Sequence, residues 1–162
     1  MCSVSLKKKF PSTIFQVAGD IDPENPSSLT MSDLDQIKIR NDVVLLGYCS
    51  DMRSIISGSD VVVLPSYREG LPKVLIEAAA CGKAVVTTDV PGCRDAIKPN
   101  VSGILVPPRD AKALADGIDT LLSNPDICRR LGLEGRNLAE SVFDVKKIVA
   151  AHLDVYSDLA GA

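Results

Sequence analysis

The chain has 162 residues, of which 46% are hydrophobic and 24% charged, and its formal net charge is −3 at pH 7. This length and composition are typical of a soluble globular protein, so we expect residues 1–162 to fold as a single domain. Acidic and basic residues are interspersed, which excludes a broad phosphate-tracking surface and makes nucleic acid an unexpected partner.

Short apolar runs rich in β-branched residues recur along the chain and predict strands. Their apolarity is continuous rather than alternating, as expected for parallel strands that are covered on both faces. The runs are TIFQVAG at 13–19, VVLLG at 43–47, VVVLP at 61–65, AVVTT at 84–88 and GILVP at 103–107.

Helical patterns lie between these runs and dominate after the last one. We expect helices near 30–39, 51–57, 72–81 and 93–97, followed by helices within 108–124, at 125–131, at 133–142 and at 144–159. Asp110 is placed to cap the first of the later helices. The fold class predicted by this alternation is α/β, with a Rossmann-like doubly wound parallel sheet and a helical C-terminal tail.

The cysteines and the lengths of the apolar runs indicate a cytoplasmic protein. The five cysteines are widely spaced and contain no CxxC pair, which fits neither a zinc site nor a disulfide framework. Apolar runs such as Val61–Leu64 are far shorter than the roughly 18 residues needed to span a bilayer. The basic run Lys7–Lys9 favours a solvated helix end over a membrane anchor, so any membrane contact would be peripheral.

The stretch SYREGLPKVLIEAAACGK, residues 66–83, predicts a short helix that follows a loop. Pro72 suits the first turn of a helix, where its missing N–H would have no partner in any case. Ala78 to Ala80 favour continuation, and Gly82 is placed to end the helix. We therefore expect a helix over residues 72–81.

The amino end of this helix predicts a phosphate site. The N–H groups of Lys73, Val74 and Leu75 would be free there, and the helix dipole adds partial positive charge. Glu69 precedes the pocket and Glu77 lies further along the helix, so the two carboxylates bracket it. Because carboxylates repel a diphosphate, we expect them to accept hydrogen bonds from hydroxyl groups of a sugar and a ribose on either side.

A simpler interpretation of the same residues is structural. Lys73 and Glu77 are spaced i, i+4 and could form a surface ion pair, and Glu69 could cap the helix. Spacing alone leaves the two interpretations open.

The amino-acid sequence around Glu69 and Glu77 resembles that of a known family. REGLPKVLIEAAACGKAVVTTDVPGCRD is similar to the E-x7-E signature of retaining, family 4 type nucleotide-sugar glycosyltransferases, with Glu69 and Glu77 as the two acids. Four other blocks, in the same order, resemble the C-terminal, donor-binding half of a GT-B enzyme: VAGDIDPENPSS, VVLLGYCSDMRSIISGSDVVVLPS, NVSGILVPPRDAKALADGI and FDVKKIVAAHLDVYSDLA.

The resemblance implies a role for each matched residue. Glu69 would contact the sugar hydroxyls as the catalytic carboxylate, and Glu77 would accept from the ribose. The diphosphate would lie along the backbone of Gly70, Leu71, Lys73 and Val74, and the base beside Tyr48 and Cys49. The donor would be a nucleotide diphosphate sugar, most similar to the UDP-sugars of bacterial capsule, O-antigen or lipid-linked glycan synthesis, with no obligatory metal or other cofactor.

The resemblance also implies parts that this sequence does not contain. Family members carry a preceding acceptor-binding domain, then a first strand of the donor domain followed by cationic motifs. In the strand order 3-2-1-4-5-6, that strand would lie between the runs at 13–19 and 61–65, leaving edges open to self-association. The last helix, 144–159, would be of the crossover type. The alternative function is a non-catalytic fragment that binds a nucleotide sugar.

Two other enzymatic interpretations compete with this one. Asp20 and Asp22 form a DxD sequence, the pattern by which metal-dependent GT-A enzymes hold a divalent ion, although neighbouring prolines favour a plain loop. Glu69 and Glu77 could be the acid and base of a glycosidase, but such pairs face each other about 5–9.5 Å apart across a cleft. A carboxylate pair around a helix amino terminus favours a phosphate between them.

Overall fold

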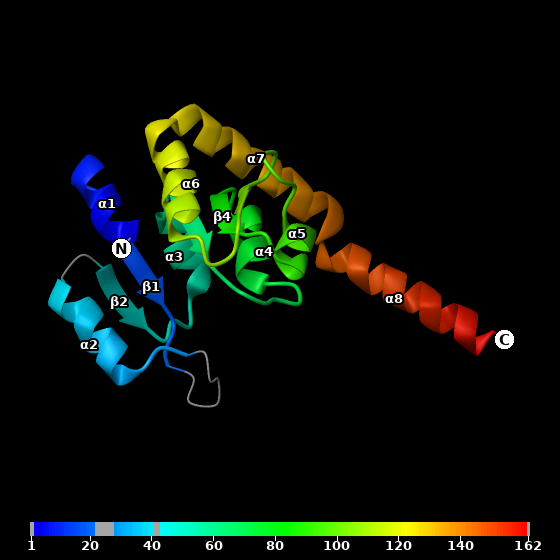
Figure 1. Ribbon diagram of the computed structural model, residues 1–162. Helices are drawn as coiled ribbons and strands as arrows, with labels where there is room; N and C mark the ends of the chain where they lie inside the picture. Colours follow the sequence, from blue (N-terminus) through cyan, green and yellow to red (C-terminus); the bar gives the residue numbers. More distant parts are fainter. Residues whose placement is uncertain (1, 22–27, 41–42, 162) are drawn as a thin grey trace. The chain divides into compact units, whose positions relative to one another are not determined.

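The computed structural model describes residues 2–21, 28–40 and 43–161 (Figure 1). The chain forms two compact units, Met1–Met52 and Arg53–Ala162. Strands and helices alternate as far as the last strand, after which helices follow one another, and all strand pairs among the described residues are parallel. The predicted α/β fold with parallel sheets is therefore confirmed.

The first unit contains a two-stranded sheet. Its elements are α1 (Cys2–Lys9), β1 (Phe15–Ala18), α2 (Met31–Arg40) and β2 (Val43–Gly47). β1 pairs with β2 in parallel. Thr30 and Asp33 form a reciprocal cap at the start of α2, because each backbone N–H donates to the other's side-chain oxygen, at 2.9 and 3.2 Å. Hydrogen bonds from Thr30 hold the pKa of the Asp33 carboxyl below its ordinary value.

The second unit contains a three-stranded sheet followed by helices. Its sheet has the strand order β3-β4-β5. The elements in chain order are α3 (Met52–Gly58), β3 (Val61–Leu64), α4 (Lys73–Ala80), β4 (Ala84–Thr88), α5 (Pro91–Ala96), β5 (Ile104–Val106), α6 (Ala111–Ser123), α7 (Pro125–Val142) and α8 (Val145–Ala160). The predicted helical C-terminal tail is present, and Asp110 caps α6 by accepting from the N–H of Ala113 at 2.8 Å.

β1 pairs in the sheet of the first unit and β3 in the sheet of the second. Each of the two strands has one paired neighbour among the described strands. The gap between them in the strand order, and self-association through their other edges, stay predictions.

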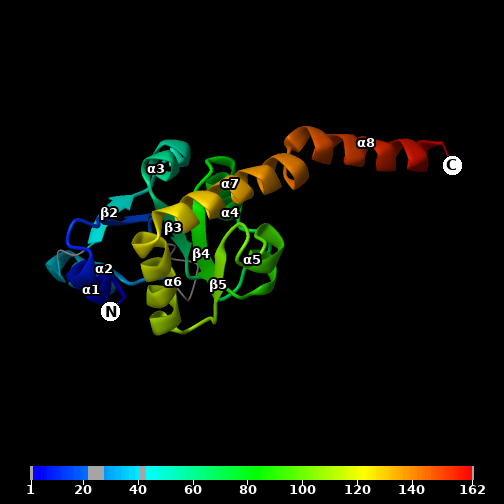
Figure 2. The ribbon, with the colours of Figure 1, turned by 90° about the horizontal axis from the view of Figure 1, so that it is seen from above.

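β4 is the centre of the core in the second unit. All five of its residues are buried, and α4, α6 and α7 all pack against it (Figure 2). The prediction that every strand is covered on both faces is wrong for β1, β2 and β3, since Val17, Val44 and Val63 are 42%, 47% and 37% exposed. Within the second unit the helices gather over β4, which leaves its neighbour β3 partly open.

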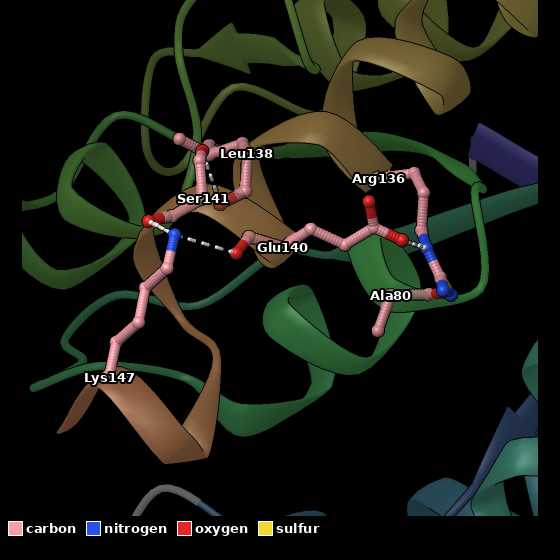
Figure 3. Close-up of polar contacts among 6 residues, drawn as sticks. All are labelled: Ala80, Arg136, Leu138, Glu140, Ser141 and Lys147. Carbon is pink, nitrogen blue, oxygen red and sulfur yellow. Dashed lines mark hydrogen bonds and ion pairs between the residues drawn. The ribbon is translucent and has the colours of Figure 1, made fainter. Parts of the chain in front are cut away.

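α4 is anchored at its carboxyl end by backbone geometry. Gly82, with φ +66°, follows the cap, and the N–H groups of Gly82 and Lys83 donate to Ala79 and Ala78 at 2.9 Å each, which is a Schellman motif. Arg136 of α7 reaches this end as well and donates through Nη1 to the carbonyl of Ala80 (Figure 3). The predicted stop at Gly82 is confirmed.

α7 is one continuous helix, and the predicted break between 131 and 133 is wrong. Gly132 is buried inside α7, and a Cβ on it would lie 2.2 Å from the carbonyl oxygen of Gly82. The glycine is there because two backbones approach closely, not because the helix ends. Its presence in the sequence indicates packing rather than a turn.

α8 begins after Asp144, whose side chain accepts from the N–H of Lys146 at 2.9 Å. Lys147 donates to the carbonyls of Glu140 and Ser141 at 3.2 and 2.9 Å, which closes the end of α7 (Figure 3). None of the residues of α8 is buried. Among the described residues, no helix has the length and apolarity that crossing a membrane requires.

We predict that Gly132→Ala lowers the free energy of unfolding by about 1–3 kcal/mol, because the new methyl group forces the α7 backbone away from Gly82. Urea denaturation followed by circular dichroism measures this change. The control is Gly58→Ala in α3, where a Cβ meets nothing within 4 Å and stability should stay the same or rise slightly. Equal effects of the two substitutions would contradict the close approach.

Candidate functional site

The candidate site lies at the carboxyl edge of the sheet in the second unit. The loop 65–72 leaves β3 there and enters α4, and the turn after β4 enters α5 at the same edge because the strands are parallel. Ligands of such sheets bind outside the carboxyl ends of the strands. The loop 65–72 carries Glu69, Gly70 and Leu71, so these three predicted residues are at the expected edge.

α4 begins one residue later than predicted. Pro72 is its N-cap residue, with φ −71° and an extended ψ of 114°, and the first helical residue is Lys73. No side chain caps this end. The amide of Leu75 is not free, because it donates to the carbonyl of Pro72 at 3.1 Å. The amides of Lys73 and Val74 are thus the ones left for an anion, since the first turn offers them no acceptor.

Glu69 is held by a neighbouring serine. Ser66 donates through Oγ to Oε1 of Glu69 at 2.6 Å. Because α4 has no side-chain cap, the interpretation of Glu69 as a helix cap is wrong. The carboxylate is half-buried and stands in the loop ahead of the helix.

Glu77 is exposed on α4 together with Lys73. In the part of the chain that the structure describes, no ion pair joins these two side chains, so the surface-pair interpretation is wrong. Leu71, in the loop, is 48% exposed, and Gly70 is exposed as well. Of the residues predicted for the diphosphate and the ribose, Gly70, Leu71, Lys73 and Glu77 are therefore exposed to solvent, and Val74 is half-buried.

The turn after β4 packs against the same loop. Gly92 in α5 is buried, and a Cβ on it would lie 2.1 Å from the carbonyl oxygen of Gly70 and 2.6 Å from that of Glu69. Arg94 stabilises the turn by donating through Nε to Oδ1 of Asp89 at 2.5 Å. This bond, with the charge of the guanidinium, holds the pKa of Asp89 below its ordinary value and raises the pKa of Arg94.

Sequence reasoning missed Ser66 and Gly92. A serine three residues before an acid has no distinctive local signal. Pro91-Gly92 at a helix start does indicate a glycine in a special place, but only the folded chain shows that the neighbour it meets is the Glu69–Gly70 backbone.

Tyr48 and Cys49 follow β2 in the first unit, whereas Glu69 belongs to the second. Tyr48 is 79% exposed, and the thiol of Cys49 lies 3.3 Å from the carbonyl oxygen of Gly47. Their contact with a base stays a prediction. Asp22 of the DxD sequence lies outside the described residues, and within those residues no three or more His, Cys, Asp or Glu side chains gather as a metal site.

Comparison with known proteins identifies relatives of this chain. A family model described as glycosyl transferases group 1 matches residues 3–138. The N,N'-diacetylbacillosaminyl-diphospho-undecaprenol alpha-1,3-N-acetylgalactosaminyltransferase of Campylobacter jejuni is 35% identical over 135 residues, which is 82% of this chain and 34% of that protein. The capsular polysaccharide biosynthesis glycosyltransferase CapM of Staphylococcus aureus is 34% identical over 127 residues, 78% of this chain and 33% of that protein. The chain thus spans about a third of the length of these curated relatives.

Solved structures share the fold. Sucrose-phosphate synthase from Thermosynechococcus elongatus superposes with a TM-score of 0.85 at 28% identity, covering 99% of this chain and 42% of that one. The Anabaena protein HepE in complex with UDP-glucose gives a TM-score of 0.74 at 21% identity, covering 97% of this chain and 52% of that one. The fold is that of the Rossmann-like half of a GT-B glycosyltransferase.

We predict that Arg94→Gln raises the pKa of Asp89 toward the ordinary aspartate value of about 3.9, because the bond that favours the carboxylate is lost. A carboxyl carbon NMR titration measures the pKa. The pKa of Asp89 is lower in the folded chain than in the unfolded chain. The pair therefore stabilises the fold at pH values above the ordinary aspartate pKa, and this stabilisation is lost as the pH falls through the lowered folded-state pKa. Arg129→Gln, on the exposed side of α7, is the control, and a shift of Asp89 in it would contradict the assignment.

Proposed function

The chain belongs to the glycosyl transferases group 1 family, and we propose that it binds a nucleotide diphosphate sugar, the UDP-sugar class being favoured. The observation that carries the proposal is the uncapped start of α4, which follows the loop of Glu69 and precedes an exposed Glu77. A helix start without a side-chain cap keeps its first amides available for an anionic ligand, and here carboxylates stand on both sides of it.

The diphosphate in this proposal lies against the loop and the first turn of α4. The backbone of Gly70 and Leu71 and the amides of Lys73 and Val74 face it. Lys73 adds a positive charge to the partial charge of the helix end. Leu75 takes no part, because its amide is bonded within the chain.

The carboxylates recognise hydroxyl groups in this proposal. Glu69 accepts from the sugar and is the catalytic carboxylate, while Glu77 accepts from the ribose. Bonds from hydroxyls to ionised carboxylates are short and strong, so two such contacts also fix the orientation of the donor. Tyr48 and Cys49 are proposed to lie beside the base.

The proposed reaction is transfer of the sugar with retention of configuration, in the manner of the family 4 type enzymes that carry the E-x7-E motif. The chain contributes stabilisation of the departing diphosphate while an acceptor hydroxyl attacks. The acceptor is proposed to be a glycan or lipid-linked glycan of the cell surface, in keeping with the names of the Campylobacter and Staphylococcus relatives. A hexose or N-acetylhexosamine is the proposed sugar, and HepE, a structural neighbour, holds UDP-glucose.

A second candidate function is binding of the nucleotide sugar without transfer by this chain alone. It is supported by the length comparison, because the chain matches about a third of each relative and the acceptor-binding domain is a proposed partner. A cytoplasmic location, peripheral at the membrane, stays a prediction from the sequence.

We predict that UDP and a UDP-sugar bind this chain. Glu77→Ala should weaken the binding of both by about 10- to 100-fold, because it removes one hydrogen bond to a charged group, which contributes about 1.5–3 kcal/mol. Isothermal titration calorimetry with UDP, GDP, UDP-glucose, UDP-N-acetylglucosamine and UDP-N-acetylgalactosamine measures the affinities. Glu134→Ala on α7 is the matched control and should bind as the parent does. If Glu77→Ala binds as well as the parent, the ribose assignment fails.

We also predict that this binding needs no metal. Repeating the titration in EDTA should leave the dissociation constant unchanged, because the proposed cradle consists of amides, Lys73 and a helix dipole. A loss of affinity in EDTA that added Mg²⁺ or Mn²⁺ restores would favour the DxD interpretation of Asp20 and Asp22.

A further inference from the structure

We propose that Ser66 and Gly92 are positioning residues that set the carboxylate of Glu69 for the sugar of the donor. The inference rests on the proposed function, in which Glu69 is the sugar-binding acid. It concerns how the end of β4 and the start of α5 hold the loop 65–72 in one conformation.

The end of β4 is fastened to the loop through two buried threonines. Thr87 is fully buried, and its hydroxyl donates to the carbonyl of Leu64 at 2.8 Å, where β3 ends. Thr88 is 3% exposed and donates to the carbonyl of Ser66. A buried hydroxyl without a partner is costly, so Thr88 favours the loop path that supplies its acceptor at Ser66, while the Thr87 hydroxyl, which also lies 3.2 Å from Sγ of Cys93, ties β4 to the last residue of β3.

Ser66 carries this constraint to the acid. Its carbonyl accepts from Thr88, and its own hydroxyl donates to Oε1 of Glu69 at 2.6 Å. A bond from a hydroxyl to a carboxylate is among the stronger protein hydrogen bonds and selects one side-chain conformation of Glu69. Among the described residues, none bonds to Oε2 of Glu69, which leaves that oxygen for a hydroxyl of the sugar.

Gly92 fixes the backbone on the other side of the acid. The space for its absent side chain is filled by the carbonyl oxygens of Glu69 and Gly70, at 2.6 and 2.1 Å from where a Cβ would stand. These are backbone atoms, so a methyl group there displaces the peptide units that carry the carboxylate. Moving these peptide units moves the Glu69 carboxylate with them, and this misplaces its contact to a sugar hydroxyl.

The test compares the sugar's contribution to binding with that of the nucleotide. Calorimetry measures the dissociation constants of UDP and of three UDP-sugars: UDP-glucose, UDP-N-acetylglucosamine and UDP-N-acetylgalactosamine. The readout is the dissociation constant of UDP divided by that of the UDP-sugar that binds most tightly. We expect Ser66→Ala to lower this ratio by about 3- to 10-fold while UDP itself binds as to the parent. Gly92→Ala should lower the ratio as well and should also weaken UDP, because the displaced peptide of Gly70 faces the diphosphate. Ser66→Thr keeps a hydroxyl and should restore the ratio. Ser59→Ala is the matched control, because the Ser59 hydroxyl donates to the carbonyl of Ile55, away from the loop 65–72.

A double-mutant cycle separates positioning from general damage. If Ser66 acts through Glu69, Ser66→Ala combined with Glu69→Ala, which removes the acceptor of the Ser66 hydroxyl, binds the UDP-sugar no more weakly than Glu69→Ala alone. Independent, additive losses would overturn the inference and leave the proposed function standing.

A ligand-free measurement keeps the inference testable by itself. NMR scalar couplings of the Glu69 side chain should indicate one rotamer in the parent and an average over rotamers in Ser66→Ala. Averaged couplings in the parent would overturn the inference. Failure of the parent to bind any nucleotide would instead overturn the proposed function.

Discussion

The burial of β4 is the constraint on which the second unit depends. Its five residues are all inaccessible, and two of them, Thr87 and Thr88, are polar. A polar side chain buried in the central strand must find a hydrogen-bond partner; Thr87 finds one in the carbonyl of Leu64 at the end of β3, and Thr88 in that of Ser66 in the loop that follows. The requirement to satisfy the Thr88 hydroxyl in the core therefore favours one path of a surface loop.

Backbone segments also approach each other closely at two glycines of this unit. Gly92 admits the Glu69–Gly70 peptides, and Gly132 admits the turn at Gly82. The first contact borders the amino end of α4, and the second borders its carboxyl end, where Arg136 also binds the carbonyl of Ala80 (Figure 3). α4 is thus fixed at both ends by neighbours that tolerate no side chain, which suits a helix whose first turn must meet a ligand in a defined place.

The sequence predicts the local elements well because each strand is a short apolar run with turn residues after it. The runs at 43–47 and 84–88 match β2 and β4 in full, and the cap at Asp110 has the bond expected of it. The failures come from contacts between distant residues. The apolar pattern of β3 does not reveal that its neighbours leave Val63 exposed, and Gly132 looks like a break until α7 is seen against Gly82. For the candidate site, Glu69 and Glu77 could be found by their spacing, whereas Ser66 and Gly92 depend on tertiary contacts that spacing does not encode.

The exposure of α8 has a consequence for the local stability of the chain. An isolated helix of its 16 residues is marginal in water, and its apolar side chains gain little here from burial, since Ile148 is 43% and Leu159 73% exposed. The bonds that Asp144 and Lys147 make at its start are on the surface. We therefore expect α8 to unfold and refold independently, with a local free energy of unfolding near zero, while the core around β4 stays folded. A single unfolding free energy for this chain would then describe the core and not its last helix.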